Sequence, residues 1–246
     1  MDNEQILRTE GLTMKFGGVT AVNNVNLSIN YQGELRCLLG PNGAGKSTFF
    51  KCLTGQLKPT EGKIEFLGHS ISGMDTHDIV NLGIGIKTQV PNLFNGLTAY
   101  ENVRLAAKRR HMKSYAIERT LEMMKRCGIS DLKGAQVGLL SHGQRQLIEL
   151  AMVLAAEPTL VLLDEPAAGM TGEERDRLSS LVKEVTKTSS VIVVEHDMAF
   201  IKQIANKVTV FHQGKIFAED HVSSIMKNKA VQEIYCLLYT SPSPRD

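Results

Sequence analysis

Residues 40–47 have the types and the spacing to bind phosphate. They read Gly-Pro-Asn-Gly-Ala-Gly-Lys-Ser and fit the pattern G-x-x-x-x-G-K-[ST], in which consecutive backbone N–H groups surround the phosphates of a nucleotide. Glycine permits positive φ and close backbone approach, Lys46 neutralises phosphate charge, and the Ser47 hydroxyl can bind Mg²⁺. From average residue usage, a match arises by chance in about one chain of this length in a hundred. A predicted strand over 34–39 and a predicted helix over 46–54 favour a phosphate loop over an ordinary glycine-rich turn.

Two carboxylates follow an apolar run at Leu160–Leu163. Asp164 and Glu165 then lie at the carboxyl end of a predicted strand, where α/β sheets place their ligands. Asp164 is suited to hold Mg²⁺ opposite Ser47, and Glu165 could orient and polarise the water that attacks a γ-phosphate. Paired acids at a strand end are often solvated turn residues, but a phosphate loop upstream favours the catalytic interpretation.

Residues 140–144 read Leu-Ser-His-Gly-Gln and precede a predicted helix over 145–155. Ser141 is a good N-cap, and its hydroxyl together with the first N–H groups of the helix could bind an anion. On its own, the pattern predicts a capped helix and nothing more.

The elements around these motifs predict an α/β fold. Residues 84–87 predict a core strand, and continuous apolar runs at 160–163 and 191–194 are typical of parallel strands covered on both faces. Alternating patterns predict antiparallel strands, and helical periods with caps (a capping box at Thr98–Glu101) predict an inserted helical subdomain at about 90–158. The predicted antiparallel strands are 7–16, 19–29, 62–67 and the hairpin 207–212 with 215–218; the predicted helices are 98–111, 114–127, 172–187 and 197–204.

Composition excludes several classes of protein. The net charge of +2 offers no global field for nucleic acid or acidic membranes, and the longest apolar run, 150–156, is far short of the roughly 20 residues that span a bilayer. The N-terminus has no signal-peptide pattern. The scattered Cys37, Cys52, Cys127 and Cys236 indicate reduced thiols rather than disulfides or a metal site.

Residues 236–246 break from the preceding helical pattern and contain Ser-Pro-Ser-Pro. They resemble either a translated sequencing adapter or a short disordered tail, and we expect the folded domain to cover 6–235.

The order of these motifs resembles that of an ATP-binding-cassette (ABC) ATPase. A phosphate loop, Gln89 at a strand end, the LSHGQ motif, the LLDE strand and Val194-Glu-His196-Asp197 follow one another as in that family. The resemblance covers nearly all of 6–235. It implies a P-loop ABC ATPase fold that binds ATP and Mg²⁺ and hydrolyses ATP to energise transport across a membrane.

The resemblance also assigns roles to residues. Phe16 matches the aromatic that stacks on adenine (the alternative is a core strand residue), Gln89 senses Mg²⁺ and the γ-phosphate, and His196 holds the γ-phosphate and the attacking water. Two such domains sandwich two ATP molecules, so Ser141, Gly143 and Gln144 would act on the ATP of a partner subunit. The expected set is catalytic Glu165, His196 and Gln89; metal-binding Ser47, Gln89 and Asp164; and nucleotide-binding Phe16, Gly40, Pro41, Asn42, Gly43, Ala44, Gly45, Lys46, Ser47, Thr48, Asp164, Ser141, Gly143 and Gln144.

Two departures from the family pattern narrow the resemblance. His142 replaces the commoner Gly of the signature, and Ala167-Ala-Gly-Met-Thr171 lacks the usual Ser and Asp of S-A-L-D. Together with Glu-His-Asp-Met and Val-Thr-Val-Phe-His-Gln-Gly, they resemble the ATPase of urea importers, close relatives of the branched-chain amino-acid importers. The resemblance therefore implies uptake of urea or short-chain amides, with branched-chain amino acids as the alternative cargo.

A transporter of this kind implies partners and a location. These are a second ATPase subunit, expected to be a homologous heterodimer partner, two transmembrane permeases, and a periplasmic or extracellular substrate-binding protein. The chain would lie at the cytoplasmic face of a bacterial-type membrane.

A non-transport ABC ATPase acting on nucleic acid or ribosomes is the rival, but such proteins usually carry tandem cassettes or a long coiled coil. A binding module without turnover is a third hypothesis, against which Glu165 and His196 argue.

Residues 108–113, Lys-Arg-Arg-His-Met-Lys, form the only dense basic run. We expect a solvated helix end there, and the alternative is a surface for lipid headgroups or an acidic partner.

Overall fold

A computed structural model of the chain describes residues 5–31 and 33–240. Its centre is a six-stranded sheet that is parallel except for its edge strand β10. The strand order is β10 (Lys215–His221), β9 (Lys207–His212), β3 (Leu35–Leu39), β8 (Ser190–Val194), β7 (Leu160–Asp164) and β6 (Ile84–Lys87).

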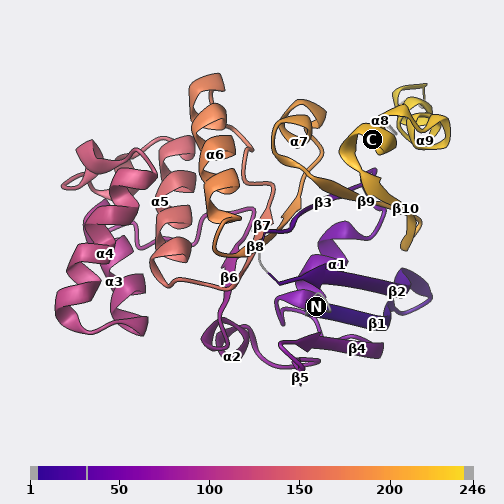
Figure 1. Ribbon diagram of the computed structural model, residues 1–246, viewed down its shortest axis with the longest axis horizontal. Helices are drawn as coiled ribbons and strands as arrows, with labels where there is room; N and C mark the ends of the chain where they lie inside the picture. The colour runs from indigo at the N-terminus through magenta and orange to yellow at the C-terminus, as the bar shows by residue number, and fades with distance from the viewer. Residues whose placement is uncertain (1–4, 32, 241–246) are drawn as a thin grey trace.

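A second sheet is antiparallel and packs on the opposite side of the central sheet from the helical group (Figure 1). Its order is β2 (Val19–Asn30), β1 (Gln5–Phe16), β4 (Glu61–Phe66) and β5 (His69–Ser70). The predicted α/β class, with an antiparallel sheet beside a parallel one, is confirmed.

Apolar residues alternate across the parallel strands and fill two cores. On β7, Val161 and Leu163 belong to the core beneath the helices, while Leu160 and Leu162 belong to the core shared with the antiparallel sheet. Because both faces are covered, β7 and β8 are apolar along most of their length, as the continuous runs at 160–163 and 191–194 predict.

Three helices stand together at one end of the molecule, away from the antiparallel sheet (Figure 1). These are α3 (Ala99–Arg110), α4 (Lys113–Arg126) and α5 (His142–Ala155), with the short turns Ser130–Leu132 and Val137–Leu139 between the last two. The other helices are α1 (Lys46–Leu53), α2 (Thr76–Asn81), α6 (Gly172–Val185), α7 (Met198–Ile204), α8 (Val222–Lys227) and α9 (Lys229–Thr240).

Thr98 caps α3 with the expected capping box, and Ser141 caps α5 in the same way. The prediction that the second of these helices begins at residue 145 is wrong. It begins at His142, because the cap residue directly precedes the first helical turn.

The end of the chain differs from the sequence prediction. Helix α9 continues to Thr240, so residues 236–240 are helical where a tail was expected. Leucine is a good helix former, and Leu237 and Leu238 extend the helix without a break. Residues 241–246 lie outside the described residues, and the origin of the tail stays a prediction.

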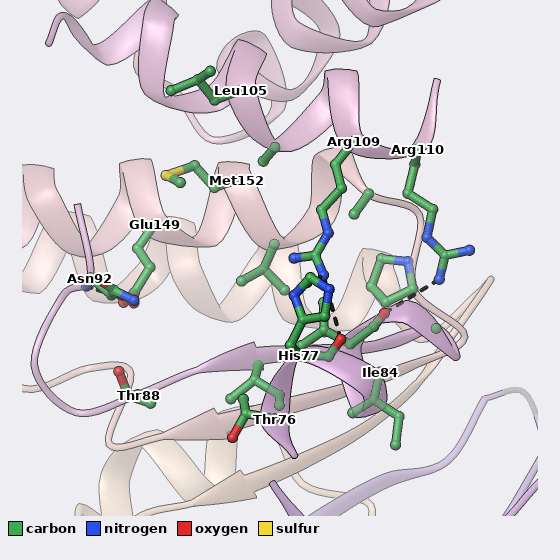
Figure 2. A pocket seen from close by; sticks show the side chains of 18 of the residues that line it. Thr76, His77, Ile84, Thr88, Asn92, Leu105, Arg109, Arg110, Glu149 and Met152 are labelled. Carbon is green, nitrogen blue, oxygen red and sulfur yellow. Dashed lines mark hydrogen bonds between the residues drawn. The ribbon is translucent and has the colours of Figure 1, made fainter. Parts of the chain in front are cut away.

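The expectation of a solvated helix end at 108–113 is confirmed, because Lys108, Arg109 and Arg110 are exposed at the end of α3. The two arginines also make contacts that the sequence did not predict. Arg109 donates to Asn81 Oδ1 at 2.8 Å and contacts His77 Nδ1 at 3.0 Å, and Arg110 donates to the Asn81 carbonyl at 3.1 Å. Both side chains reach from α3 across to α2 (Figure 2). They join the helical group to the core beside β6, which the sequence could not show because α2 was not predicted.

None of the helices in the described ranges combines the length and the apolar character needed to cross a membrane.

Candidate functional site

The sheet topology brings four sequence motifs to one edge. Strands β3, β8, β7 and β6 are neighbours and parallel, so their carboxyl ends lie side by side. The loop 40–45 follows β3, His196 follows β8, Glu165 follows β7, and Gln89 follows β6. Residues far apart in the sequence therefore meet in one cluster.

The loop between β3 and α1 has the predicted glycine conformations. Gly43 has φ of 78°, and Gly45, the N-cap of α1, has φ of 102°. A Cβ on Gly45 would lie 2.4 Å from the carbonyl oxygen of Ala21, so no other residue fits there. The open end of the loop therefore consists of backbone, as binding of a phosphate requires.

Lys46 lies over this loop. Its side chain is buried, and its Nζ donates to the carbonyl oxygens of Gly40 at 2.6 Å and Pro41 at 3.0 Å. Burial lowers the pKa of Lys46, while the nearby charges of Glu165 and Asp164 act in the opposite direction. Ser47 is exposed beside it and Thr48 is half-buried, both in the first turn of α1.

Asp164, the last residue of β7, has the character of a ligand for a cation. Burial, and then repulsion from Glu165, raises the pKa of Asp164 from 3.8 to about 6. Among the described residues no group donates a hydrogen bond to its carboxylate. A half-buried carboxylate without donors, close to Lys46, fits a divalent cation carried with a nucleotide, because Mg²⁺ prefers carboxylate and phosphate oxygens.

Glu165 is the centre of a polar cluster. Gln89 Nε2 donates to Glu165 Oε2 at 2.9 Å, and His196 Nδ1 lies 3.4 Å from Glu165 Oε1. Glu165 has φ of 43°, a left-handed conformation that costs a non-glycine residue about 1–2 kcal/mol. The strained backbone holds its carboxylate between the amide and the imidazole, where it can accept a proton from water.

Glu195 supports this cluster, and the sequence analysis gave it no role. Its carboxylate is buried and accepts hydrogen bonds from the backbone N–H groups of Ala167 at 3.1 Å, His196 at 3.1 Å and Asp197 at 3.4 Å. Burial raises the pKa of Glu195, and these donors act against the rise. An acid that directly follows the apolar strand β8 is the signal that could have identified it.

The LSHGQ segment is built as a helix start. Ser141 Oγ accepts from the Gln144 N–H at 3.3 Å, and the Gln144 side chain accepts from the Ser141 N–H at 3.0 Å. A Cβ on Gly143 would lie 2.3 Å from Glu174 Oε2, so a larger residue there would have to displace the carboxylate of Glu174. Within the described part of the chain, no hydrogen bond or ion pair joins residues 141–144 to the loop 40–48.

Phe16 ends β1 with its ring 46 % exposed. Phe16 is exposed, so the alternative of a core strand residue is wrong, and its stacking on adenine stays a prediction.

A groove of about 500 Å³ lies beside the cluster, between α2, β6 and the helices α3 and α5. We name it the Ile84 groove after its floor; Figure 2 shows Leu105 and Met152 facing it from the helices. Thr88, Asn92 and Phe94, from the segment that follows β6, form one wall, so the groove borders the chain that carries Gln89.

Comparisons with known proteins agree with this geometry. Residues 22–168 match the family described as "ABC transporter". The branched-chain amino acid transport ATP-binding protein BraF of Pseudomonas aeruginosa is 34 % identical, over 94 % of this chain and 97 % of its own length. LivG of Escherichia coli, described in the same words, is 32 % identical, over 95 % of this chain and 98 % of its own.

Among solved structures, the ADP conformation of MJ1267, an ATP-binding cassette of an ABC transporter, superposes with a TM-score of 0.84. It is 26 % identical, with 94 % of this chain and 98 % of that chain covered.

Proposed function

The chain belongs to the ABC transporter family. We propose that it is the ATPase subunit of an importer that takes up urea. It is an ATP-binding protein that hydrolyses ATP to energise transport, and its relatives lie in the branched-chain amino-acid importer group. The observation that supports an active ATPase most strongly is the contact of Glu165 with both Gln89 and His196 at the edge of the phosphate loop.

Hydrolysis would use this chain's own residues in three ways. Backbone N–H groups of the loop 40–45 and Lys46 hold the phosphates, which requires Lys46 to exchange its bonds to the loop carbonyls for phosphate oxygens. Ser47, Asp164 and Gln89 would hold Mg²⁺, which neutralises phosphate charge.

Glu165 orients and polarises the attacking water, and His196 stabilises the charge that develops on the γ-phosphate. The two side chains are neighbours, with Nδ1 of His196 3.4 Å from Oε1 of Glu165, so both can reach the same γ-phosphate.

A second subunit would complete the site. Ser141, Gly143 and Gln144 make no hydrogen bond or ion pair with the loop 40–48 in the described part of the chain, and we assign the nucleotide that they bind to a partner subunit. The first turn of α5 points free N–H groups at that position, as an anion requires. Phe16, with its open ring, would stack on adenine.

The Ile84 groove is the proposed contact with the permease subunits. Phe94 and Leu105 line it and are 58 % and 45 % exposed, an apolar surface that a helix of a membrane subunit can cover. This docking would hold the chain at the cytoplasmic face of the membrane, with a substrate-binding protein on the other side of the complex. Movement of the groove wall would act directly on Gln89.

Urea is the proposed cargo because the LSHGQ and Ala-Gly-Met-Thr segments resemble those of urea-importer ATPases. Branched-chain amino acids are the second candidate, favoured by the names of BraF and LivG. At 34 % and 32 % identity, about two thirds of the positions differ, so the cargo of these relatives does not transfer with their fold.

The test is uptake in the host bacterium after deletion of this gene. Deletion should abolish uptake of labelled urea at low external concentration and leave uptake of leucine unchanged. The wild-type gene should restore it, Lys46→Ala should not, and Lys108→Ala serves as an exposed basic control. Loss of leucine uptake alone would favour the second candidate, and loss of neither would contradict both cargoes.

A further inference from the structure

Gln146 connects the LSHGQ segment to Gln89. It lies on α5 with 0 % of its surface exposed. Its Nε2 donates to the backbone carbonyl of Gln89 at 3.3 Å and lies 2.9 Å from Nε2 of His142. The carbonyl needs a donor, so the amide nitrogen must face it, and His142 then accepts the second hydrogen. One buried amide therefore joins two segments 57 residues apart in the sequence.

A second contact lies one turn further along the same helix. Glu149 Oε1 accepts from the backbone N–H of Asn92 at 3.0 Å, and its Oε2 lies 3.7 Å from Nζ of Lys87. Figure 2 shows Glu149 descending from α5 onto Asn92. Lys87 also donates to the Thr88 carbonyl at 3.3 Å. Residues 87–92 are therefore held at both ends by α5.

The buried pair Lys87 and Glu149 contributes little to the free energy of folding. Lys87 is 0 % and Glu149 is 4 % exposed, and burial lowers the pKa of Lys87 and raises that of Glu149, each opposed by the charge of the other. Buried ion pairs are often no more stable than apolar residues of the same size. Stability alone therefore gives no reason for polar groups here, whereas control over the position of the bound backbone does.

The position of Gln89 matters for the proposed hydrolysis of ATP. Gln89 donates its side chain to Glu165 at 2.9 Å, while its carbonyl is held by Gln146 at 3.3 Å. A continuous chain of contacts thus runs from His142 through Gln146 and Gln89 to Glu165 and His196.

We infer that Gln146 is a positioning residue for hydrolysis, which fixes the Gln89 amide against Glu165 and ties it to His142 of the LSHGQ segment. This inference rests on the proposed function of Gln89 and Glu165. Gln146 touches neither nucleotide nor water in this role, and it acts only through Gln89. Glu149 and Lys87 hold the other end of the same segment.

The experiment compares the wild-type chain with Gln146→Met, each assembled with the partner subunits of the importer. Met keeps the length and volume of Gln146 and removes both hydrogen bonds. In Gln146→Met, kcat for phosphate release from Mg-ATP should be roughly tenfold lower than in wild type or lower still, because displacing a positioned group by about 1 Å can cost a hundredfold in rate. KM for ATP should stay within about twofold of the wild-type value. In a Gln89→Ala background, Gln146→Met should have no further effect. Thr120→Val, a buried polar change on α4, is the control and should leave kcat unchanged.

Hydrogen exchange provides a readout that does not depend on activity. In Gln146→Met without nucleotide, amides of residues 88–92 should exchange at least about tenfold faster, with the global melting temperature close to that of wild type. The double variant Lys87→Met with Glu149→Met should melt at or above the wild-type temperature and still show faster exchange there.

Several results would overturn the inference. A wild-type kcat in Gln146→Met would do so, as would kcat losses from Gln89→Ala and Gln146→Met that multiply in the double variant. Unchanged hydrogen exchange at residues 88–92, or a fall in kcat that appears only together with a lower melting temperature, would do so as well. A wild-type chain that releases no phosphate even when assembled with its partner subunits would contradict the proposed function, and exchange at 88–92 would still decide the positioning.

Discussion

Replacement of Asp164 by Asn should stabilise the ligand-free protein while weakening its binding of Mg-ATP. The carboxylate is half-buried, accepts no hydrogen bond among the described residues and lies close to Glu165. These surroundings raise the pKa of Asp164 from 3.8 to about 6, so its charged form is disfavoured in the folded state. Asn keeps the shape of the side chain and removes the charge.

The shift of the Asp164 pKa sets the size of the gain in stability that Asp164→Asn should bring. A rise from 3.8 to about 6 corresponds to about 3 kcal/mol at pH 7, and partial exposure with solvent screening reduces this to about 1.5 kcal/mol. For a chain of this length, that free energy raises the melting temperature by about 3–6 °C.

The effect must also depend on pH. Because the folded state binds the Asp164 proton more tightly than the unfolded chain, the wild type has its full stability below about pH 4 and loses it as the pH rises through about 6. The advantage of Asp164→Asn should therefore be complete at pH 7.5 and about half as large at pH 5.

Thermal melting of both proteins at the two pH values tests the reasoning. With Mg-ATP present at pH 7.5 the order should reverse, because only the wild type gains from binding the cation. A less stable Asp164→Asn variant without ligand, or a gain in stability that is equal at both pH values, would refute the claim that the charged form of this carboxylate destabilises the folded protein.

Three further predictions follow from other parts of the structure. Lys46→Ala should weaken nucleotide binding about 10- to 100-fold in a titration, since charge-assisted hydrogen bonds contribute about 1.5–3 kcal/mol, and unchanged affinity would reject its role. Arg36→Met should cost about 3–5 kcal/mol in urea unfolding, because buried Arg36 binds Glu34 and Glu219, and Glu34 would be left without a cationic partner. The exposed control Arg8→Met should cost under about 1 kcal/mol. Arg109→Ala with Arg110→Ala should speed hydrogen exchange in α2, and exchange equal to that of Lys108→Ala would show that the two arginines do not hold it.

Local patterns in the sequence were sufficient to predict most strands and the capped helices. The strand 84–87 and the helix cap at Thr98 are observed as predicted, because apolar periodicity and capping depend on neighbours in the chain. Helix α2 was not predicted, since six residues are too few to show a helical period.

The candidate site was predictable as a set of motifs and not as a network. Parallel strands present their carboxyl ends at one edge of a sheet, and Gln89, Glu165 and His196 each follow a parallel strand, so they could be expected at that edge. The contacts of Gln146 and Glu149 join α5 to a segment 57 residues away, and no local pattern reports such a pair. A polar residue within an apolar helix face was the available signal.

The most direct test of the account is the rate of phosphate release from Mg-ATP by the wild-type chain and by Glu165→Gln, each assembled with its partner subunits, with ATP affinity measured in parallel. Loss of a group that polarises water typically lowers the rate about 10²- to 10⁴-fold, so Glu165→Gln should bind ATP as tightly as wild type and release phosphate at least about a hundredfold more slowly. Release near the wild-type rate would contradict the central role given to Glu165 between Gln89 and His196.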